Sequence, residues 1–168
     1  MAETTGLPPV VDEESRVLIL GTLPGAESLR RQQYYSDRRN QFWALLGRVF
    51  EEPIGPGYPD RLALLREHGI AVWDVLRSAV RTGSSDAAIT HAEPNDFEGL
   101  FRAFPGLRRV GFNGTKAERL WRRHIAPSRV IADADVAVRG LPSSSGTPGR
   151  NVFPFDEKLA RWRAFLRP

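Results

Sequence analysis

The chain has 168 residues with a formal net charge of +4; 41% of them are hydrophobic and 26% are charged. This length suits one α/β domain that buries roughly 70% of its unfolded surface, and the composition excludes a disordered tail. The absence of cysteine excludes disulfides, thiolate metal sites and a cysteine nucleophile. No apolar run approaches the roughly 20 residues that span a bilayer, so we expect no membrane as a partner.

Two further features of the composition bear on ligands. Lysine occurs only at Lys116 and Lys158 among the 24 basic positions. Arginine suits bidentate phosphate contacts and stacking on bases, but a GC-rich genome produces the same bias without any function, so nucleic-acid binding stays open. The histidines, His68, His91 and His124, are not spaced like metal ligands. We expect no metal and no other cofactor, and only a site made of carboxylates alone stays open.

The first fifteen residues are acidic and contain proline, without the basic and apolar pattern of a signal peptide. We expect a flexible N-terminal leader over 1–15 and a single domain over 16–168. The protein is expected to be intracellular, in the cytoplasm.

The hydrophobic pattern of the chain indicates alternating strands and helices. Arg16–Leu20, for example, is a β-branched apolar run that ends in Gly21, which predicts a buried strand. In chain order we expect strands at 16–20, 70–75 and 109–112 and one or two short strands within 130–138, with helices at 40–50, 60–67, 96–104, 115–124 and 155–166. An irregular loop with some helix is expected at 21–39, and loops are expected at 81–95 and 141–150.

This alternation predicts a three-layer α/β/α fold with a central, mostly parallel four-stranded sheet. Ligands of such folds bind at the carboxyl ends of the strands. The loops that begin at Gly21, Asn113 and Leu141 leave those ends. We therefore expect these three loops to converge on one cleft.

The first loop has the ingredients of a site for a planar base. It lacks the ending of a Walker loop and the G-x-G-x-x-G fingerprint. Its glycines and proline let the backbone approach a ligand, and the aromatic residues that follow, Tyr35 and Phe42 among them, offer faces for stacking. The alternative is a tight turn followed by core aromatics. The loop residues considered for base binding are Gly21, Thr22, Leu23, Pro24 and Gly25.

Two other loops carry candidate polar groups. The amide of Asn113 offers a donor and an acceptor to the edge of a nucleobase, although an asparagine there also suits a helix cap. Ser143, Ser144 and Ser145 offer small hydroxyls and backbone amides to phosphate, although most serine-rich loops are only loops. Asp74, at the end of the expected second strand, either orients a loop or acts in the site.

In this order, the segments resemble the uracil-DNA glycosylase superfamily, and most closely its hypoxanthine-DNA glycosylase branch. The resemblance runs from about residue 17 to residue 165. Its motifs are the G-x-x-P loop, Q-Y-Y, N-x-F-W, A-V-W-D-V, R-x-G-S-x-D, N-D-F, F-N-G-x-x-A and L-P-S-x-S. The loop after Ser145 departs from the branch, because Gly146 to Arg150 replaces a shorter stretch.

The resemblance implies a monofunctional DNA glycosylase of base-excision repair. Such an enzyme flips a deaminated base, hypoxanthine or uracil, out of DNA and hydrolyses its N-glycosidic bond to leave an abasic site. It implies DNA with a deaminated base as the partner, a monomer, and a place at the nucleoid of a bacterial-type cell. Uracil-specific branches carry a water-activating Asp or Asn where this chain has Leu23, and a histidine where it has Leu141.

In the hypoxanthine branch the resemblance assigns catalysis to Asn40, assisted by Asn113. We hypothesise that Asn40 positions a water beneath C1′, that Asn113 also binds the base edge, and that Tyr35 or Phe42 stacks on the base. The serines at 143–145 would bind phosphates, and Arg150 would enter the vacated stack or hold the backbone.

Two alternatives stay open. Because Leu23 and Leu141 are apolar, the chain could be a lesion-DNA-binding protein that retains the base pocket but is catalytically weak or inactive. A hydrolase of small nucleotides is disfavoured, because no carboxylate-rich metal site is apparent.

Overall fold

The computed structural model describes residues 2–82, 89–149 and 152–168. At its centre lies a four-stranded parallel sheet with the strand order β3-β2-β6-β7. β2 (Val17–Gly21) lies between β3 (Ile70–Asp74) and β6 (Arg109–Asn113), and β7 (Ala137–Leu141) forms one edge. The predicted α/β class and the four-stranded parallel sheet are confirmed.

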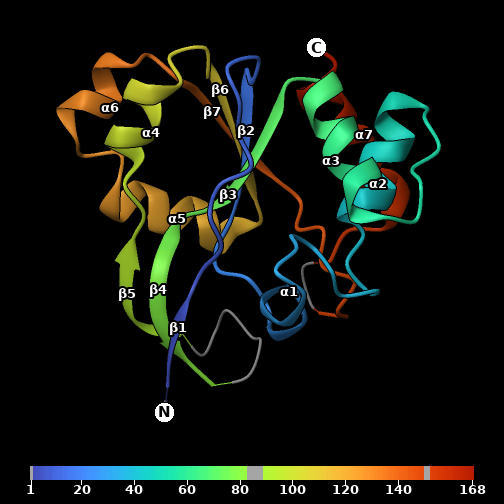
Figure 1. The fold of residues 1–168 in the computed structure, drawn as a ribbon, viewed down its shortest axis with the longest axis horizontal. Helices are drawn as coiled ribbons and strands as arrows, with labels where there is room; N and C mark the ends of the chain where they lie inside the picture. The colour runs from blue at the N-terminus through green and yellow to red at the C-terminus, as the bar shows by residue number, and fades with distance from the viewer. Residues whose placement is uncertain (1, 83–88, 150–151) are drawn as a thin grey trace.

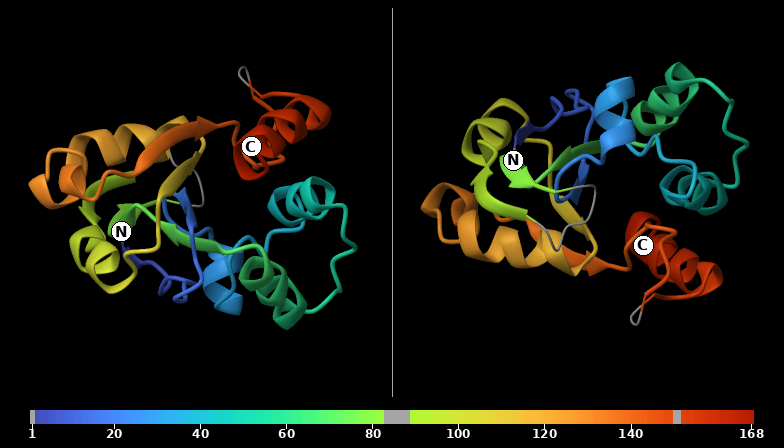
Figure 2. Two further views of the ribbon diagram at one scale, coloured as in Figure 1. Left: turned by 90° about the horizontal axis from the view of Figure 1, so that it is seen from above. Right: turned by 90° about the horizontal axis from the view of Figure 1, so that it is seen from below.

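Helices cover both faces of this sheet (Figure 1). On one side lie α2 (Phe42–Phe50), α3 (Tyr58–Glu67) and α7 (Phe155–Leu166), and on the other lie α4 (Phe97–Ala103), α5 (Thr115–His124) and α6 (Arg129–Asp133). The views from above and below in Figure 2 show the same separation. α1 (Ala26–Arg31) follows the carboxyl end of β2. None of the helices in the described part of the chain combines the length and the apolar character that a membrane crossing requires.

The core follows from strands that are covered on both faces. Every residue of β2 and β3 is buried, as expected for apolar runs inside a parallel sheet. The four tryptophans are core residues, with at most 8% of any of them exposed. Three of them also use the indole N–H: those of Trp43, Trp73 and Trp162 donate to backbone carbonyls of loops. The tryptophans therefore fasten loops to the core as well as fill it.

A second, three-stranded antiparallel sheet was missed by the sequence analysis. It has the order β1-β4-β5 and consists of β1 (Glu3–Thr5), β4 (Leu76–Arg81) and β5 (Ile89–Pro94). β5 falls inside the segment 81–95, which we expected to be a loop. Its residues are exposed or half-buried, so they lack the apolar alternation on which the prediction of a strand depends.

The N-terminal segment differs from the flexible leader expected over 1–15. β1 pairs with β4, and Val10 forms a bridge with Val72. Leu7 is 6% exposed, and its carbonyl accepts hydrogen bonds from Trp73 Nε1 at 3.1 Å and from the Tyr34 hydroxyl at 3.3 Å. The described residues of this segment are thus fastened to the rest of the chain by partners that are distant in the sequence.

The segment 130–138, where we expected one or two strands, begins as a helix. Ser128 caps α6, its Oγ accepting from the N–H of Ile131 at 3.5 Å. The strand β7 begins only at Ala137. The capping serine decides the local structure here, because an N-cap stabilises a short helix over a run of apolar residues that would also suit a strand.

Leu7 provides a test of the N-terminal packing. Leu7→Ala should lower the free energy of unfolding by about 2 to 5 kcal/mol, because it leaves a cavity among buried neighbours. Val138 is 53% exposed, so the control Val138→Ala should change the free energy of unfolding by less than about 0.5 kcal/mol. Urea denaturation measures both. Equal stability of Leu7→Ala and the wild type would contradict the packing of this segment.

Candidate functional site

A cavity of about 500 Å³ lies at the carboxyl ends of the parallel strands. The loops after β2 and β7 and Asn113, the last residue of β6, all contribute to its wall, so the three strand ends meet at one cleft as predicted. The segment before α2 supplies the remaining side. The predicted site residues that line the cavity are Gly21, Thr22, Leu23, Pro24, Gly25, Tyr35, Asn40, Asn113, Ser143, Ser144 and Ser145.

Phe42 and Arg150 are the predicted site residues outside this set. Phe42 is fully buried, and its ring stacks on that of Tyr35 with a centroid distance of 3.9 Å. The ring of Phe42 therefore supports Tyr35 from behind and does not itself face the cavity. Arg150 lies outside the described residues.

The first loop is held in shape by a buried arginine. Arg81, at the end of β4, is 8% exposed and donates to the carbonyls of Leu23 and Pro24. Backbone polar groups in a loop need such partners when water is excluded. The sequence marks Arg81 only as part of a motif, because nothing local indicates that β4 and the first loop are neighbours.

Asp74 is a site residue that the sequence analysis left undecided. It ends β3, lines the cavity and is 5% exposed. A Cβ placed on Gly21 would lie 2.5 Å from Asp74 Oδ1 and 3.2 Å from the Tyr35 hydroxyl oxygen. Glycine at position 21 is thus required to leave room for this carboxylate and for the tyrosine. The available signal was a single acidic residue at the end of a fully buried strand.

The two asparagines are joined by hydrogen bonds through one serine. Asn113 Oδ1 accepts from the backbone N–H of Ser144 at 2.7 Å, and its Nδ2 donates to Ser144 Oγ at 2.8 Å and to the Tyr35 hydroxyl at 3.2 Å. Ser144 Oγ in turn donates to Asn40 Oδ1 at 2.9 Å. That oxygen also accepts from the N–H of Phe42 at 2.9 Å. The predicted pair, Asn40 and Asn113, is therefore brought together in one network.

The three serines of the last loop have different surroundings. Ser144 is fully buried, whereas Ser143 is exposed and Ser145 is half-buried. The hydroxyl of Ser144 is thus enclosed between the asparagines and cannot reach a phosphate at the surface in this conformation. The Ser145 carbonyl accepts from Lys158 Nζ at 3.0 Å, and this ammonium also donates to Gln41 Oε1 at 2.8 Å.

Lys158 connects the site loops to α7. It is 2% exposed, and burial lowers its pKa because the charged form loses hydration. The sequence pattern of α7 does not indicate this contact, because a lysine on an amphipathic helix is usually exposed to solvent. The ammonium couples the last loop to the segment before α2.

The two positions that are polar in uracil-specific branches are closed and apolar in this structure. Leu23 is 6% exposed and Leu141 is 5% exposed. Ionised carboxylates are found at the rim instead: hydrogen bonds from Arg30 and Arg31 lower the pKa of Glu27 to about 2, and those from Arg39 lower the pKa of Asp37 to about 2. The cavity therefore has the amides of Asn40 and Asn113 and the buried carboxyl group of Asp74 in its wall, and paired charges at its entrance.

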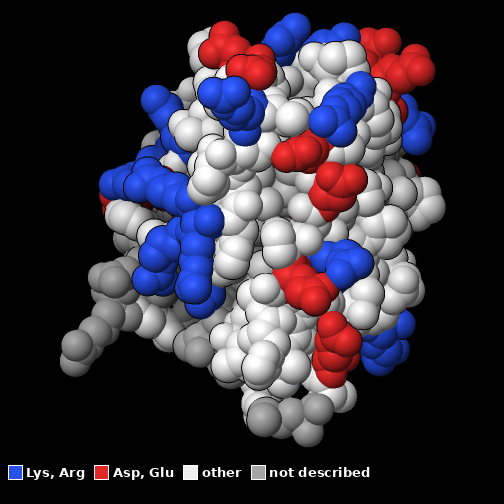
Figure 3. Space-filling view, turned by 90° about the vertical axis from the view of Figure 1, so that its left-hand side faces the viewer, with Lys and Arg blue, Asp and Glu red and all other residues white. Residues whose placement is uncertain are grey.

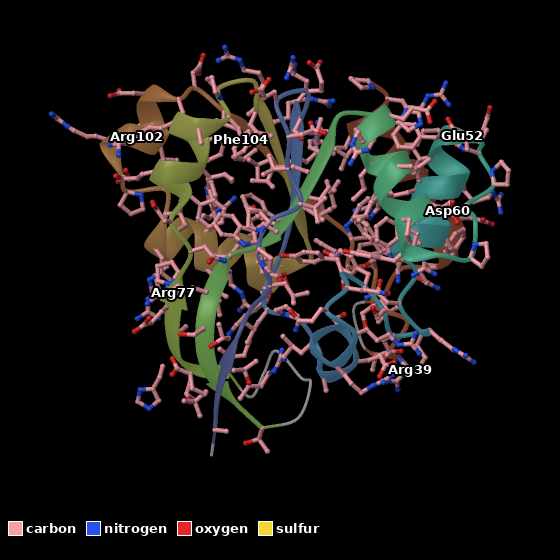
Figure 4. The ribbon with its side chains drawn as sticks, in the orientation of Figure 1. Arg39, Glu52, Asp60, Arg77, Arg102 and Phe104 are labelled. Atoms are coloured by element: carbon pink, nitrogen blue, oxygen red, sulfur yellow. The ribbon has the colours of Figure 1, made fainter. Side chains whose placement is uncertain are left out.

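One group of side chains elsewhere could hold a metal ion. Potential ligand atoms of Glu52, Glu67 and His68 lie within 4.8 Å of one another. His68 Nε2 lies 2.8 Å from Glu52 Oε1, and its ring stacks on Phe50. Figure 4 shows Glu52 on the side of α2 and α3, apart from Arg39, which lines the cavity. The His68 ring and the Glu52 carboxyl group are at hydrogen-bonding distance, and none of these three residues lines the cavity.

Comparisons with known proteins agree with this geometry. The profile of the uracil DNA glycosylase superfamily matches residues 8–148. A hypoxanthine DNA glycosylase of Methanosarcina acetivorans is 39% identical over 163 residues, which are 96% of this chain and 97% of that protein. A second one, from Methanosarcina barkeri, is 42% identical over 113 residues, which are 67% of this chain and 72% of that protein.

A solved structure is also similar along the whole chain. It is a solution NMR structure from Methanosarcina acetivorans, provisionally assigned as a uracil DNA glycosylase. The TM-score is 0.82 at 36% sequence identity, with 99% of this chain and 98% of the other covered. Sequence and structure together show that this chain belongs to the uracil DNA glycosylase superfamily.

Proposed function

We propose that this chain is a DNA glycosylase that removes hypoxanthine from DNA by hydrolysing its N-glycosidic bond. The observation that carries the proposal is the joined pair of amides, Asn40 and Asn113, in a cavity that is also lined by Leu23. Leu141, the second apolar position, is buried in β7 opposite Asn113. Relatives at 39% and 42% identity are named hypoxanthine DNA glycosylases. Uracil is the second deaminated base that we propose as a substrate.

The size of the cavity supports a base that has left the duplex. A volume of about 500 Å³ is within the range of small-molecule sites. A base stacked in a duplex cannot enter it, so the nucleotide must be flipped out at a cost of a few kcal/mol. We propose that the ring of Tyr35, which is backed by Phe42, stacks on the flipped base.

The chemistry requires stabilisation of a departing base anion and of a sugar with oxocarbenium character. The electron pair of the C1′–N bond leaves with the base, a water oxygen bonds to C1′, and the water proton passes to solvent as the base is protonated. Uncharged amides are weak general catalysts. We therefore propose slow turnover and a preference for bases that leave readily, without a metal or another cofactor.

The rim of the cavity has groups suited to the DNA backbone. Ser143 and Ser145 stay candidates for phosphate contacts, and the start of α5 lies beside them, since a Cβ on Gly114 would be 3.3 Å from that of Ser143. The N-cap residue of α5 is Gly114, which has no side chain to cap the first turn, and N–H groups at a helix start attract phosphate. We propose that a monomer binds DNA here, as an intracellular repair enzyme at the nucleoid.

Cations on the same side extend this candidate surface. Figure 3 shows Lys and Arg side chains gathered at the left-hand edge of the side that carries α4, α5 and α6, while several others in view lie beside carboxylates. Lys116 and Arg119 are on α5, and within the described ranges of the chain neither forms an ion pair. By contrast, Arg102 pairs with Glu98 and Arg161 with Glu157.

The second candidate function is a lesion-DNA-binding protein without hydrolysis. Leu23 and Leu141 favour it, because these buried apolar side chains occupy the two positions at which uracil-specific branches carry an Asp or Asn and a histidine. Such a protein would bind the flipped base in the same cavity but leave no abasic site.

A panel of duplexes distinguishes these functions. Duplexes that each contain one hypoxanthine, uracil or xanthine are incubated with excess protein and then treated with hot alkali. We expect strand breaks at hypoxanthine with the wild type and a loss of about 100-fold or more in rate with Asn40→Ala, since this substitution removes the amide from the site. Tight lesion binding without breaks would establish the second function instead. Wild-type cleavage by Asn40→Ala would remove Asn40 from the mechanism.

Gly21 should be intolerant of any side chain. Gly21→Ala places a methyl group 2.5 Å from Asp74 Oδ1, so the carboxylate and Tyr35 must shift and the cavity must change shape. We expect cleavage of the hypoxanthine duplex to fall by about tenfold or more. Gly149→Ala is the control, because among the described residues its Cβ would meet only Val152, at 3.4 Å. If Gly21→Ala cleaved like the control, this cavity would not be the one that binds the base.

The proposed backbone contacts predict a change in salt dependence. The double variant Lys116→Gln/Arg119→Gln should weaken duplex binding and reduce the slope of log K against log salt by about 0.9 for each phosphate that the variant no longer neutralises. Arg102→Gln/Arg161→Gln removes the same charge from ion-paired positions and should leave the slope nearly unchanged. Fluorescence anisotropy of labelled duplexes at several salt concentrations measures the binding constant and its salt dependence. Equal slopes for both double variants would exclude α5 from the DNA interface.

A further inference from the structure

Ser144 occupies the centre of the site without access to its surface. It is fully buried, and its hydroxyl contacts both Asn40 and Asn113. Its backbone takes part too: the N–H donates to Asn113 Oδ1 at 2.7 Å, and the carbonyl accepts from the N–H of Gln41 at 2.8 Å. One residue thus joins the end of β6 to the segment before α2.

The orientation of the Asn113 amide is set by backbone chemistry. A backbone N–H can only donate, so the atom that faces Ser144 N must be the amide oxygen of Asn113. The other end of the amide is therefore Nδ2, and its two hydrogens are used by Ser144 Oγ and by the Tyr35 hydroxyl. Asn113 can therefore offer a ligand the second lone pair of Oδ1, which accepts a hydrogen bond.

The orientation of the Asn40 amide follows by the same logic. Its oxygen accepts from the N–H of Phe42. Ser144 Oγ already accepts from Asn113, so its single hydrogen donates to Asn40 Oδ1. Both lone pairs of that oxygen are then occupied. Nδ2 is left, and no hydrogen bond in the described part of the chain uses it. What Asn40 offers a ligand is a donor.

We propose that Ser144 is a positioning residue that fixes the hydrogen-bonding polarity of the cavity, holding Asn40 as a donor and Asn113 as an acceptor. This inference rests on the proposed function and deepens it. Deamination of adenine turns the ring nitrogen N1 from an acceptor into a donor and the neighbouring substituent from a donor into an acceptor. An acceptor from Asn113 and a donor from Asn40 therefore complement the N–H and the carbonyl oxygen of the deaminated base. Against adenine the same two groups would face an acceptor and a donor that they cannot pair with, so adenine is rejected.

The same polarity changes the role expected for Asn40. We hypothesised that Asn40 positions a water, but an amide with both oxygen lone pairs occupied cannot accept a proton or a hydrogen bond from that water. Donation from Nδ2 to the base instead stabilises the negative charge that the base acquires as the C1′–N bond breaks. The water attacks C1′ and releases its proton to solvent, so the amide itself exchanges no proton.

Ser144→Ala tests the proposal with the full-length protein. The backbone bonds of Ser144 stay, so we expect a folded protein that binds the hypoxanthine duplex with a Kd within about threefold of the wild type, while the single-turnover rate constant falls about tenfold or more. Ser144→Thr keeps the hydroxyl and should recover most of the rate. The control Ser128→Ala removes a hydrogen-bonded hydroxyl far from the cavity and should keep the wild-type rate. A wild-type rate for Ser144→Ala overturns the proposal.

A second readout does not depend on activity. In the wild type both Nδ2 hydrogens of Asn113 are hydrogen-bonded, so its side-chain NH₂ signal should exchange slowly with solvent in NMR spectra, and Ser144→Ala should speed this exchange. Unchanged exchange overturns the proposal even if the rate falls. If the wild type makes no abasic sites, the proposed function fails, and the NMR comparison still decides whether Ser144 holds the amides. If Ser144→Ala does not fold, Ser144→Cys, which is of similar size but a weak donor, must show the same loss of rate for the proposal to stand.

Discussion

The register of the parallel sheet is the constraint on which the site depends. It pairs Gly21 with Asp74 across β2 and β3, and Asn113 with Leu141 across β6 and β7. Because parallel strands share a direction, these residues end their strands in one row along the same edge of the sheet. A slip of one residue in any strand would turn its last side chain to the opposite face. The row at the strand ends is therefore as rigid as the core from which it emerges.

The loops beyond this row are held by a few long polar side chains. Arg81 binds carbonyls of the first loop, Lys158 binds the last loop and Gln41, and the Trp162 indole donates to the Pro142 carbonyl. Each of these groups satisfies backbone or amide atoms that the burial of a loop would otherwise leave without partners. The cavity wall is thus built from irregular backbone that is fixed almost as firmly as regular structure.

The interior of the cavity combines the amides of Asn40 and Asn113 with one buried carboxyl group, that of Asp74. Charges at the rim, such as Glu27 and Asp37, are held in ion pairs, and the amides inside act through the direction of their hydrogen bonds. A directed amide can distinguish a donor from an acceptor at a base edge, and it contributes less to bond cleavage than a charged acid or base. We therefore propose that the amides serve to select a base more than to speed its release.

Most of the framework could be predicted from the residues alone. The buried strands follow from apolar runs, and α5 and α7 begin and end where the sequence pattern predicts. Parallel strands bring their carboxyl ends together, so the convergence of the loops after Gly21, Asn113 and Leu141 was predictable as well. The N-terminal strand and β5 were not, because their pairing depends on long-range partners, such as Glu3 with Val80, and not on an apolar pattern of their own.

By itself, the sequence determined the fold class, the edge of the sheet that carries the site, and the asparagines within it. Only the tertiary structure decided what each side chain does there. It placed Phe42 behind Tyr35, Asp74 in the cavity wall, and Ser144 inside the network and away from phosphate. The reason is physical: the Ser144 hydroxyl meets Asn40 across 104 positions of the chain, and no local pattern shows which partner a small polar group will have once it is buried.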